Sequence, residues 1–372
     1  MATTVDQTEQ IVEQEIPTTM KAVVAYAPRD FRLEQVPVPE VGLSEVLVKV
    51  EANGICAGDV KLFKGAESFW GGGGQPAWVK APVIPGHELL GRVVRLGEGA
   101  AEKYGLSVGD RVISEQIVPC WECRFCKEGQ YWMCEVHDIY GFQNNVNGGY
   151  AEYMKYPAKA LVYKVPDEIP MKLAILIEPL GCSIHAVERA QIQFRDVVVL
   201  SGAGPLGLGM IGPAKLKNPA LLIVLDMNDE RLELAKNFGA DMVMNPGKED
   251  VVTRIKELTD GYGCDVYIEA TGHPSSVIQG LSMIRKLGRF VEFSVFNDPV
   301  TVDWSIIGDR KELDIYGAHL SAYTFPLAIN YLHNRLVNME GVVTHVLPVE
   351  EFERGIEMVA SGKESIKVVL VP

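Results

Sequence analysis

The chain has 372 residues, 47% hydrophobic and 23% charged, which is enough apolar material for two globular cores and too much for a disordered protein. Its 35 basic and 49 acidic residues give a net charge of −14, which repels phosphate backbones, so we expect no nucleic-acid partner. No apolar run reaches the roughly 18 residues of a membrane helix, and the first basic residue is Lys21. We therefore expect no membrane span, no signal peptide and a cytoplasmic protein.

The first half of the chain is predicted to be mainly β. Residues 1–19 are polar and acidic without a periodic pattern, which is typical of a loose or pairing N-terminal arm. From Met20 to about residue 165, short β-type runs beginning at residues 21, 31, 45, 88 and 111 alternate with turn residues.

The second half changes to strands that alternate with helical stretches. A helix-length segment begins at Met171 and leads to the strand DVVVL, and further strands begin at residues 220, 264, 289 and 313. This alternation predicts six parallel strands with crossover helices in a doubly wound α/β domain. The tail after residue 319 has helix, strand, helix and strand patterns, and we expect it to rejoin the first domain.

A dinucleotide-binding fingerprint follows the strand that ends at Ser201. The sequence G-x-G-x-x-G there opens a helix, so its glycines would permit a tight turn, close approach of a pyrophosphate, and close packing of helix on strand. A carboxylate nineteen residues after the last glycine would bind a ribose hydroxyl and repel a 2′-phosphate, which favours NAD over NADP. A nearby arginine is either a partner for a 2′-phosphate or a lining residue of the adenosine pocket. The predicted cofactor residues are Gly202, Gly204, Pro205, Leu206, Gly207, Asp226 and Arg231.

Four of the seven cysteines lie within fifteen residues, with the spacing Cys120-x2-Cys123-x2-Cys126-x7-Cys134. In a reducing compartment, four thiolates in one short loop match the closed tetrahedral coordination of a structural zinc ion. We therefore predict a structural zinc lobe over residues 118–136.

A second ligand set is scattered along the sequence: Cys56, His87 with Glu88, and Glu178. Each residue alone is weak evidence, because a lone cysteine is more often an inert core residue. Together they supply the thiolate, imidazole and carboxylate ligands that a catalytic zinc takes while it keeps one position open.

The motifs resemble those of the zinc-dependent medium-chain dehydrogenases, the family of alcohol, sorbitol, xylitol and threonine dehydrogenases. The matching motifs, in chain order, are G-I-C-x-x-D at Gly54 to Asp59, G-H-E at Gly86 to Glu88, the four-cysteine lobe, E-P-L at Glu178 to Leu180, and the glycine fingerprint. The resemblance implies a GroES-like β catalytic domain, formed by residues 1–170 and 319–372, with an NAD-binding Rossmann domain inserted at residues 171–318.

The resemblance also implies roles for the second ligand set. Cys56 and His87 would bind the catalytic zinc directly, Glu88 would be a ligand or a neighbour of one, and Asp59 would orient the ligand histidine. Glu178 stands where alcohol dehydrogenases have cysteine and polyol dehydrogenases have glutamate, which points toward sugar alcohols.

Three features depart from the family pattern. Gly58 and Lys61 occupy the places of a Ser or Thr and a His that relay the alcohol proton, so the proton must leave through water or through Glu178 or Glu88. Leu320 and Ser321 stand where sorbitol dehydrogenases have Arg-Tyr, a pair that contacts the longer polyol. This exchange implies a shorter polyol substrate, or different contacts to the far end of the polyol.

The expected function is zinc-dependent, NAD-linked oxidation of a secondary hydroxyl of a short sugar alcohol, with erythritol or threitol favoured. Two zinc ions per chain and one NAD are the expected cofactors. The alternatives are sorbitol, xylitol, a sugar-alcohol phosphate or threonine as substrate, a zinc-independent quinone or enoyl reductase, and a structural protein that holds NAD. By analogy with relatives we expect a dimer or tetramer, with the apolar run RFVEFSVF as a candidate edge for pairing.

The remaining aromatic and histidine residues fall into two groups. Phe69, Trp70 and Trp78 flank the run Gly71 to Gly74 and either line a pocket or anchor the loop. We expect the histidines without a partner in the sequence pattern to be packed or solvated: His137, His185, His273, His319, His333 and His345.

Overall fold

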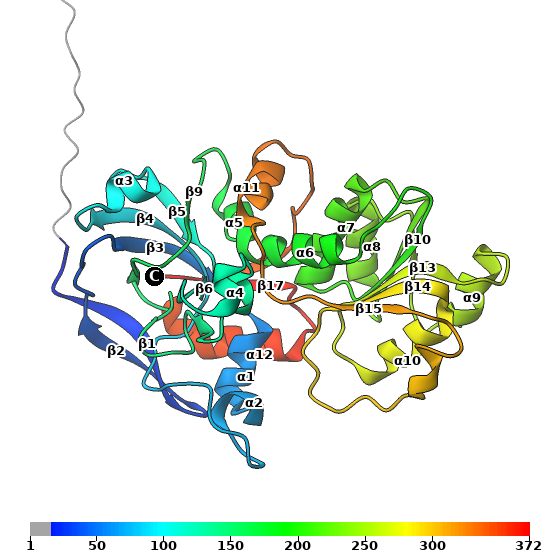
Figure 1. The fold of residues 1–372 in the computed structure, drawn as a ribbon. Helices are drawn as coiled ribbons and strands as arrows, with labels where there is room; N and C mark the ends of the chain where they lie inside the picture. Colours follow the sequence, from blue (N-terminus) through cyan, green and yellow to red (C-terminus); the bar gives the residue numbers. More distant parts are fainter. Residues whose placement is uncertain (1–15) are drawn as a thin grey trace, which may run out of the picture.

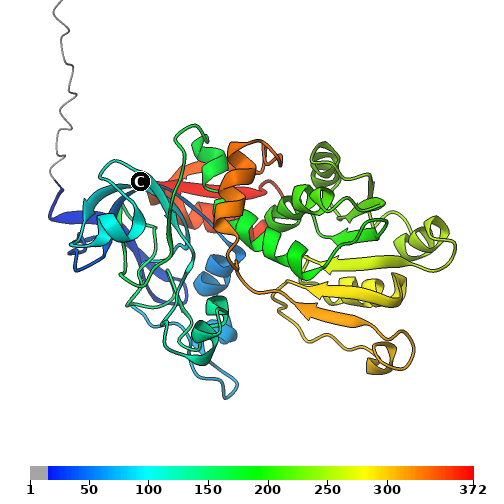
Figure 2. The same ribbon diagram turned by 45° about the horizontal axis from the view of Figure 1, so that its top comes forward.

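The computed structural model describes residues 16–372, so most of the expected N-terminal arm lies outside the described residues. Two large sheets organise the described chain, one in the β-rich half at the left of Figure 1 and one in the α/β half at the right, and β1-β2 and β6-β7 form two further two-stranded sheets. The helix α6 (Ile177–Arg189) lies between the two halves in both ribbon views (Figures 1 and 2).

The β-rich half is built from both ends of the chain. Its main sheet has the order β16-β17-β3-β4-β5-β9, with β8 paired to β3, and the C-terminal strand β17 runs antiparallel to β3 with Leu370 opposite Asn53. The predicted return of the tail to the first half is therefore present in the sheet. The strands of this half are β1 (Thr19–Ala27), β2 (Asp30–Pro37), β3 (Val46–Gly54), β4 (Glu88–Leu96), β5 (Arg111–Ser114), β6 (Ile117–Val118), β7 (Asp138–Ile139), β8 (Tyr153–Tyr156), β9 (Val162–Lys164), β16 (Val343–Pro348) and β17 (Lys367–Val371).

The α/β half is a six-stranded parallel sheet with the order β12-β11-β10-β13-β14-β15. This order is the doubly wound arrangement that the alternating pattern predicted, with its crevice at the ends of the central strands. Helices cover both faces, α7 and α8 on one and α9 and α10 on the other (Figure 1). The elements are β10 (Val197–Ser201), α7 (Pro205–Leu216), β11 (Leu221–Leu225), α8 (Asp229–Asn237), β12 (Met242–Met244), α9 (Val251–Leu258), β13 (Cys264–Glu269), α10 (Pro274–Met283), β14 (Ile284–Glu292) and β15 (Asp314–Gly317).

The structure corrects one expectation in this half. The run RFVEFSVF was a candidate edge, but its ordered part is β14, which is hydrogen-bonded to β13 on one side and β15 on the other. Phe290 and Val291 are buried in this interior strand, and the edge on this side of the sheet is β15.

The remaining helices join the two halves or cover the β sheet. The fingerprint strand is preceded by a helical segment that breaks at Ile175 and Leu176, so the single predicted helix is two. The helices are α1 (Ala57–Lys64), α2 (Glu67–Trp70), α3 (Ala100–Tyr104), α4 (Arg124–Lys127), α5 (Met171–Ala174), α6, α11 (Phe325–His333) and α12 (Phe352–Ser361), with 3₁₀ turns at Tyr131–Met133, Trp304–Ile306 and Val349–Glu351.

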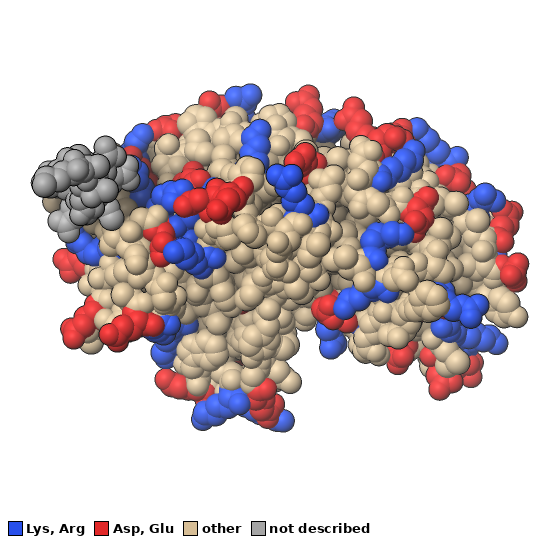
Figure 3. Space-filling view, turned by 90° about the horizontal axis from the view of Figure 1, so that it is seen from above, with Lys and Arg blue, Asp and Glu red and all other residues tan. Residues whose placement is uncertain are grey.

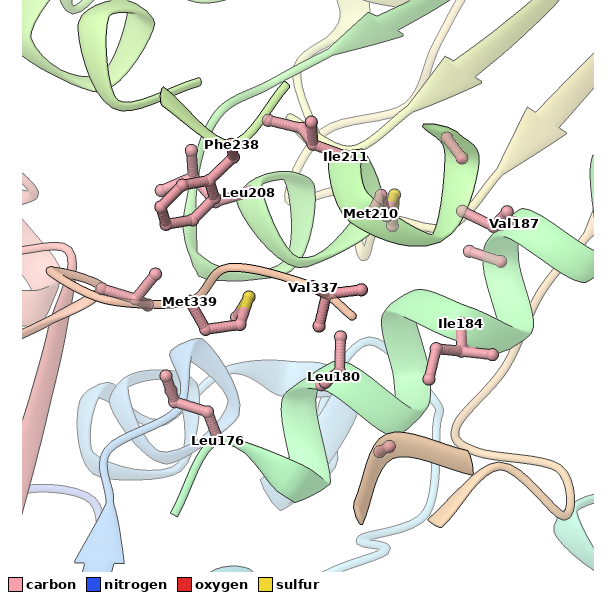
Figure 4. Packing of buried hydrophobic residues seen from close by; sticks show 14 of the residues in the cluster. Leu176, Leu180, Ile184, Val187, Leu208, Met210, Ile211, Phe238, Val337 and Met339 are labelled. Carbon is pink, nitrogen blue, oxygen red and sulfur yellow. The ribbon is translucent and has the colours of Figure 1, made fainter. Parts of the chain in front are cut away.

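One hydrophobic core runs through the junction of the halves. Leu180 and Ile184 on α6 lie at helical spacing, and Figure 4 shows them near Val337 and, further along the cluster, Met210 of α7. The same cluster includes Phe325 of α11, so this helix packs at the junction. The division at residues 170/171 and 318/319 stays a prediction.

The surface matches the composition. On the face drawn in Figure 3, acidic and basic side chains are interspersed and form no continuous basic stripe. Among residues 16–372, no helix combines the length and apolar character needed to cross a bilayer.

Candidate metal and cofactor sites

The four cysteines of the predicted lobe converge in the structure. Cys120, Cys123, Cys126 and Cys134 place their sulfur atoms within 4.8 Å of one another, and the Sγ atoms of Cys120 and Cys126 are 3.9 Å apart. Four sulfurs about 2.3 Å from one tetrahedral zinc would be about 3.8 Å apart, so the donor set fits this ion.

Backbone amides prepare the lobe for anionic sulfur. The N–H groups of Glu122 and Cys123 donate to Cys120 Sγ at 3.4 and 3.3 Å. Backbone hydrogen bonds lower the pKa of Cys123 to about 6, whereas burial raises the pKa of Cys126 to about 12. A bound cation would stabilise the thiolate form of all four residues, because a metal ligand must be deprotonated.

The second predicted set also comes together, from positions far apart in the sequence. Cys56 caps the N-terminus of α1 just after β3, and Glu88 begins β4 directly after His87. Since β3 and β4 are paired, with Gly54 opposite Glu88, the ends of these strands bring the ligands together. One ligand atom from each of Cys56, His87 and Glu88 lies within 4.8 Å of the others, and the described residues contain only this group and the four-cysteine lobe as clusters of three or more such donors.

Asp59 lies beneath this cluster and is fully buried. Its Oδ2 accepts hydrogen bonds from the Cys56 amide at 2.9 Å and the Tyr150 hydroxyl at 3.1 Å. Its Oδ1 is 3.6 Å from His87 Nδ1, and among the described residues neither atom has a hydrogen-bond partner. A small side-chain movement would let His87 Nδ1–H donate a hydrogen bond to Asp59 Oδ1 and leave His87 Nε2 to bind a metal. Ligand histidines are commonly oriented in this way.

Sequence reasoning did not find Lys367, the partner of Glu88. Both oxygens of Glu88 accept from Lys367 Nζ, at 2.6 and 2.7 Å, and both side chains are buried. Burial lowers the pKa of Lys367, but the Glu88 carboxylate raises it, and the net effect is a raised pKa. The lysine therefore keeps its ammonium form. No motif marks this lysine, because it lies 279 residues away on the last strand.

Glu178 lies in the first turn of α6 and is outside the tight group of three. The cluster still acts on Glu178 electrostatically: burial and the Glu88 carboxylate raise the pKa of Glu178 to about 7, whereas His87 lowers it. The Cys182 thiol donates to Glu178 Oε1 at 3.6 Å, and the Gln116 amide donates to Cys182 Sγ at 3.2 Å.

Glu115, the residue before Gln116, is a second buried group that sequence reasoning did not find. Glu115 has no exposed surface and accepts from the hydroxyls of Tyr131 and Tyr163, each within 2.8 Å, and of Ser321 at 3.2 Å. Burial outweighs these hydrogen bonds and raises the pKa of Glu115 to about 7. Because Tyr131 belongs to the zinc lobe, Glu115 links the lobe to the segment that follows β15.

The glycine fingerprint lies at the end of β10, as its strand-to-helix context requires. Gly202 has φ +107° and a side chain there would meet the Ala270 carbonyl at 2.7 Å. A side chain at Gly207 would lie 2.0 Å from the Gly202 carbonyl oxygen, so helix and strand approach as closely as the motif predicts. Gly204 borders open space, and Pro205 is the first residue of α7, with Leu206 next, so their end of the helix is free to receive a phosphate.

The end of β11 borders an open pocket of about 550 Å³, lined by Asp226, Asn228 and Arg231 among others. Asp226 accepts from the amides of Ala203 and Asn228, which fix its carboxylate beside the fingerprint turn. Arg231 lines the pocket, but its guanidinium donates to the carbonyls of Gly362 and Ser365. It is therefore positioned as a lining residue and already has partners.

Both halves of the chain match known protein families. Residues 42–167 match the family model of the alcohol dehydrogenase GroES-like domain, and residues 205–334 match that of the zinc-binding dehydrogenases. The chain is 55% identical over 361 residues to erythritol/L-threitol dehydrogenase of Mycolicibacterium smegmatis, covering 97% of this chain and 100% of that protein. It is 36% identical to L-threonine 3-dehydrogenase of Pyrococcus horikoshii, covering 91% and 94% of the two chains.

The fold is shared with solved structures. An Escherichia coli alcohol dehydrogenase crystallised with NADH superposes with a TM-score of 0.85 at 29% identity, covering 96% of this chain and 100% of that one. The predicted combination of a GroES-like domain and a Rossmann domain is thus confirmed. The chain belongs to the zinc-binding, medium-chain alcohol dehydrogenase family.

Proposed function

We propose that this enzyme oxidises a secondary hydroxyl of a four-carbon sugar alcohol, erythritol or threitol, to a tetrulose with NAD as acceptor. The observation that carries the proposal is the cluster of Cys56, His87 and Glu88 with Glu178 beside it, in a chain 55% identical to an erythritol/L-threitol dehydrogenase. A bound zinc ion would polarise the substrate hydroxyl, and NAD would accept the hydride.

The chain's own residues position these groups. Cys56 and His87 would hold the metal, and Asp59, fixed by the Cys56 amide and Tyr150, would orient the imidazole. The fingerprint turn would fix the dinucleotide at the N-terminus of α7.

We propose Glu178 as the third protein ligand of the catalytic zinc. Lys367 engages both oxygens of Glu88, and its ammonium group would repel a cation that bound there. Gly58 and Lys61 provide no hydroxyl-imidazole relay, because neither side chain carries a hydroxyl or an imidazole. The Lys61 ammonium instead donates to the Val295 carbonyl at 2.9 Å. The hydroxyl proton would leave to water or to a glutamate of the site.

The two carboxylates can be distinguished by isosteric variants. Glu178→Gln is expected to lower the zinc content from about two to about one per chain and to lower kcat at least about 100-fold. Glu88→Gln is expected to retain about two zinc ions. The opposite pattern in metal analysis would assign the ligand to Glu88.

A panel of substrates tests the function itself. Erythritol, threitol, xylitol, sorbitol, a sugar-alcohol phosphate and threonine would each be offered with NAD and with NADP, and the reduced cofactor followed by absorbance. We expect the highest kcat/KM for a tetritol, as the similarity to an erythritol/L-threitol dehydrogenase suggests. We expect NAD to be preferred over NADP, because the Asp226 carboxylate opposes a 2′-phosphate. A larger kcat/KM for any other substrate would replace the tetritol proposal.

We also propose a homo-oligomer and a cytoplasmic location. The edge strand β15 carries Ile315, which is 40% exposed, and such an edge can pair with a second copy. Light scattering of the purified protein would detect a dimer or tetramer. Thiolate ligands need a reducing compartment such as the cytoplasm, and fractionation of cells would test it.

A further inference from the structure

Two histidines far apart in the sequence, His137 and His319, meet at the junction of the halves. His137 follows the zinc lobe, and His319 follows β15. Their Nε2 atoms are 3.3 Å apart, and both side chains are half-buried. The His319 carbonyl faces Nδ1 of His185 on α6 at 3.1 Å, which fixes the backbone of this segment.

A row of aromatic rings connects this pair to the catalytic cluster. The His137 ring lies 5.8 Å from Trp78, Trp78 lies 5.0 Å from Phe142, and Phe142 lies 5.4 Å from His87. Phe142 also faces Gly58, where a side chain would lie 3.5 Å from its ring and 3.8 Å from Cys56 Sγ. The ring contacts thus form one continuous row from His87 to His137.

The polar groups at the His137 end of this row can form hydrogen bonds with neutral hydroxyls. Burial together with the neighbouring His137 and His185 lowers the pKa of His319 to about 4, so the His319 imidazole is uncharged near neutral pH. A neutral imidazole offers one donor and one acceptor, as a hydroxyl does, so a substrate hydroxyl could replace either ring as the partner in the Nε2–Nε2 contact. Trp78 Nε1 adds a buried N–H that has no partner among the described residues.

We propose that His137, His319 and the indole N–H of Trp78 bind the hydroxyl groups of the polyol farthest from the reacting carbon. The inference rests on the proposed polyol oxidation and extends it to a subsite for the far end of the substrate. The subsite offers hydrogen bonds without a fixed charge, so it selects a neutral polyol over a phosphorylated one.

The test compares two substrates that share a vicinal diol and differ in their terminal hydroxyls: erythritol and 2,3-butanediol. His137→Phe and His319→Phe keep an aromatic ring and remove the hydrogen bonds. We expect each variant to lower kcat/KM for erythritol by about tenfold, mainly through KM, with less than about twofold change for 2,3-butanediol. His319→Gln, which keeps a donor and an acceptor, should recover part of the loss.

Controls separate the possible failures. His333→Phe repeats the substitution at the exposed end of α11 and should leave both substrates unchanged. Zinc content and the thermal stabilisation of each variant by NADH verify that the protein remains loaded. Equal losses for both substrates, or no loss for erythritol in either variant, would overturn the subsite. If the wild-type enzyme oxidises no tetritol at all, the proposed function fails, and the subsite inference fails with it.

Discussion

At the scale of single residues, the buried pair Glu88–Lys367 gives the sharpest energetic prediction. Removing the ammonium by Lys367→Met would leave the Glu88 carboxylate buried without a counter-charge, at a cost on the order of 3 kcal/mol in the free energy of unfolding. The double variant Glu88→Gln/Lys367→Met should recover much of this loss. Urea unfolding of the four proteins, with zinc in excess, measures the cycle, and a negligible effect of the single variant would contradict the pairing.

Glu115 predicts a pH dependence of stability. Its folded-state pKa of about 7 lies above the usual value of 4.5, so the unfolded chain releases this proton first. Glu115 therefore lowers the free energy of unfolding progressively as the pH rises from about 4.5 to 7, by an amount on the order of 3 kcal/mol. Glu115→Gln, which cannot ionise, should become more stable relative to wild type over this range. Parallel pH profiles of wild type and variant would show that Glu115 is not buried as an acid.

These residues also mark the limit of what sequence can reveal. Cys56, His87 and the four lobe cysteines occur in short motifs whose spacing carries the chemistry, so they could be named from sequence. Lys367 and Glu115 acquire their environment only from contacts across the fold, such as Lys367 reaching Glu88 from 279 residues away. No local pattern encodes such a contact.

At the scale of elements, the zinc lobe should behave as a unit. Cys123→Ser removes one ligand, so we expect the loss of one zinc per chain and local opening of residues 118–136, seen as faster amide hydrogen exchange. Cys264→Ser, in the buried sheet strand β13, is the matched control and should retain both zinc ions. Unchanged zinc content in Cys123→Ser would show that this cysteine is not a ligand.

Elements with a long apolar pattern were predictable, and short ones were not. The strands β10, β11 and β13 stand out as apolar runs because they are buried on both faces of a parallel sheet. The edge element β12 has three residues and was not located, although the total of six strands was correct. The end of α10 is also not marked in the sequence, since the helix ends at Met283 and Ile284 begins β14 without a turn residue between them.

At the scale of the whole molecule, the function depends on bringing together the two halves. In the proposed site, the GroES-like half contributes Cys56, His87 and the lobe, the junction helix α6 contributes Glu178, and the Rossmann half contributes the proposed dinucleotide site. The chain order of the motifs made this architecture predictable. The approach of His137 to His319 at the junction was not predictable, because it depends on packing around α6.

Zinc analysis of His87→Ala beside wild type, combined with erythritol oxidation in the presence of NAD, tests the central claim most directly. We predict about two zinc ions per chain in the wild type, about one in the variant, and loss of turnover in the variant with the fold retained. A variant that keeps both zinc ions, or oxidises erythritol at the wild-type rate, would contradict the account.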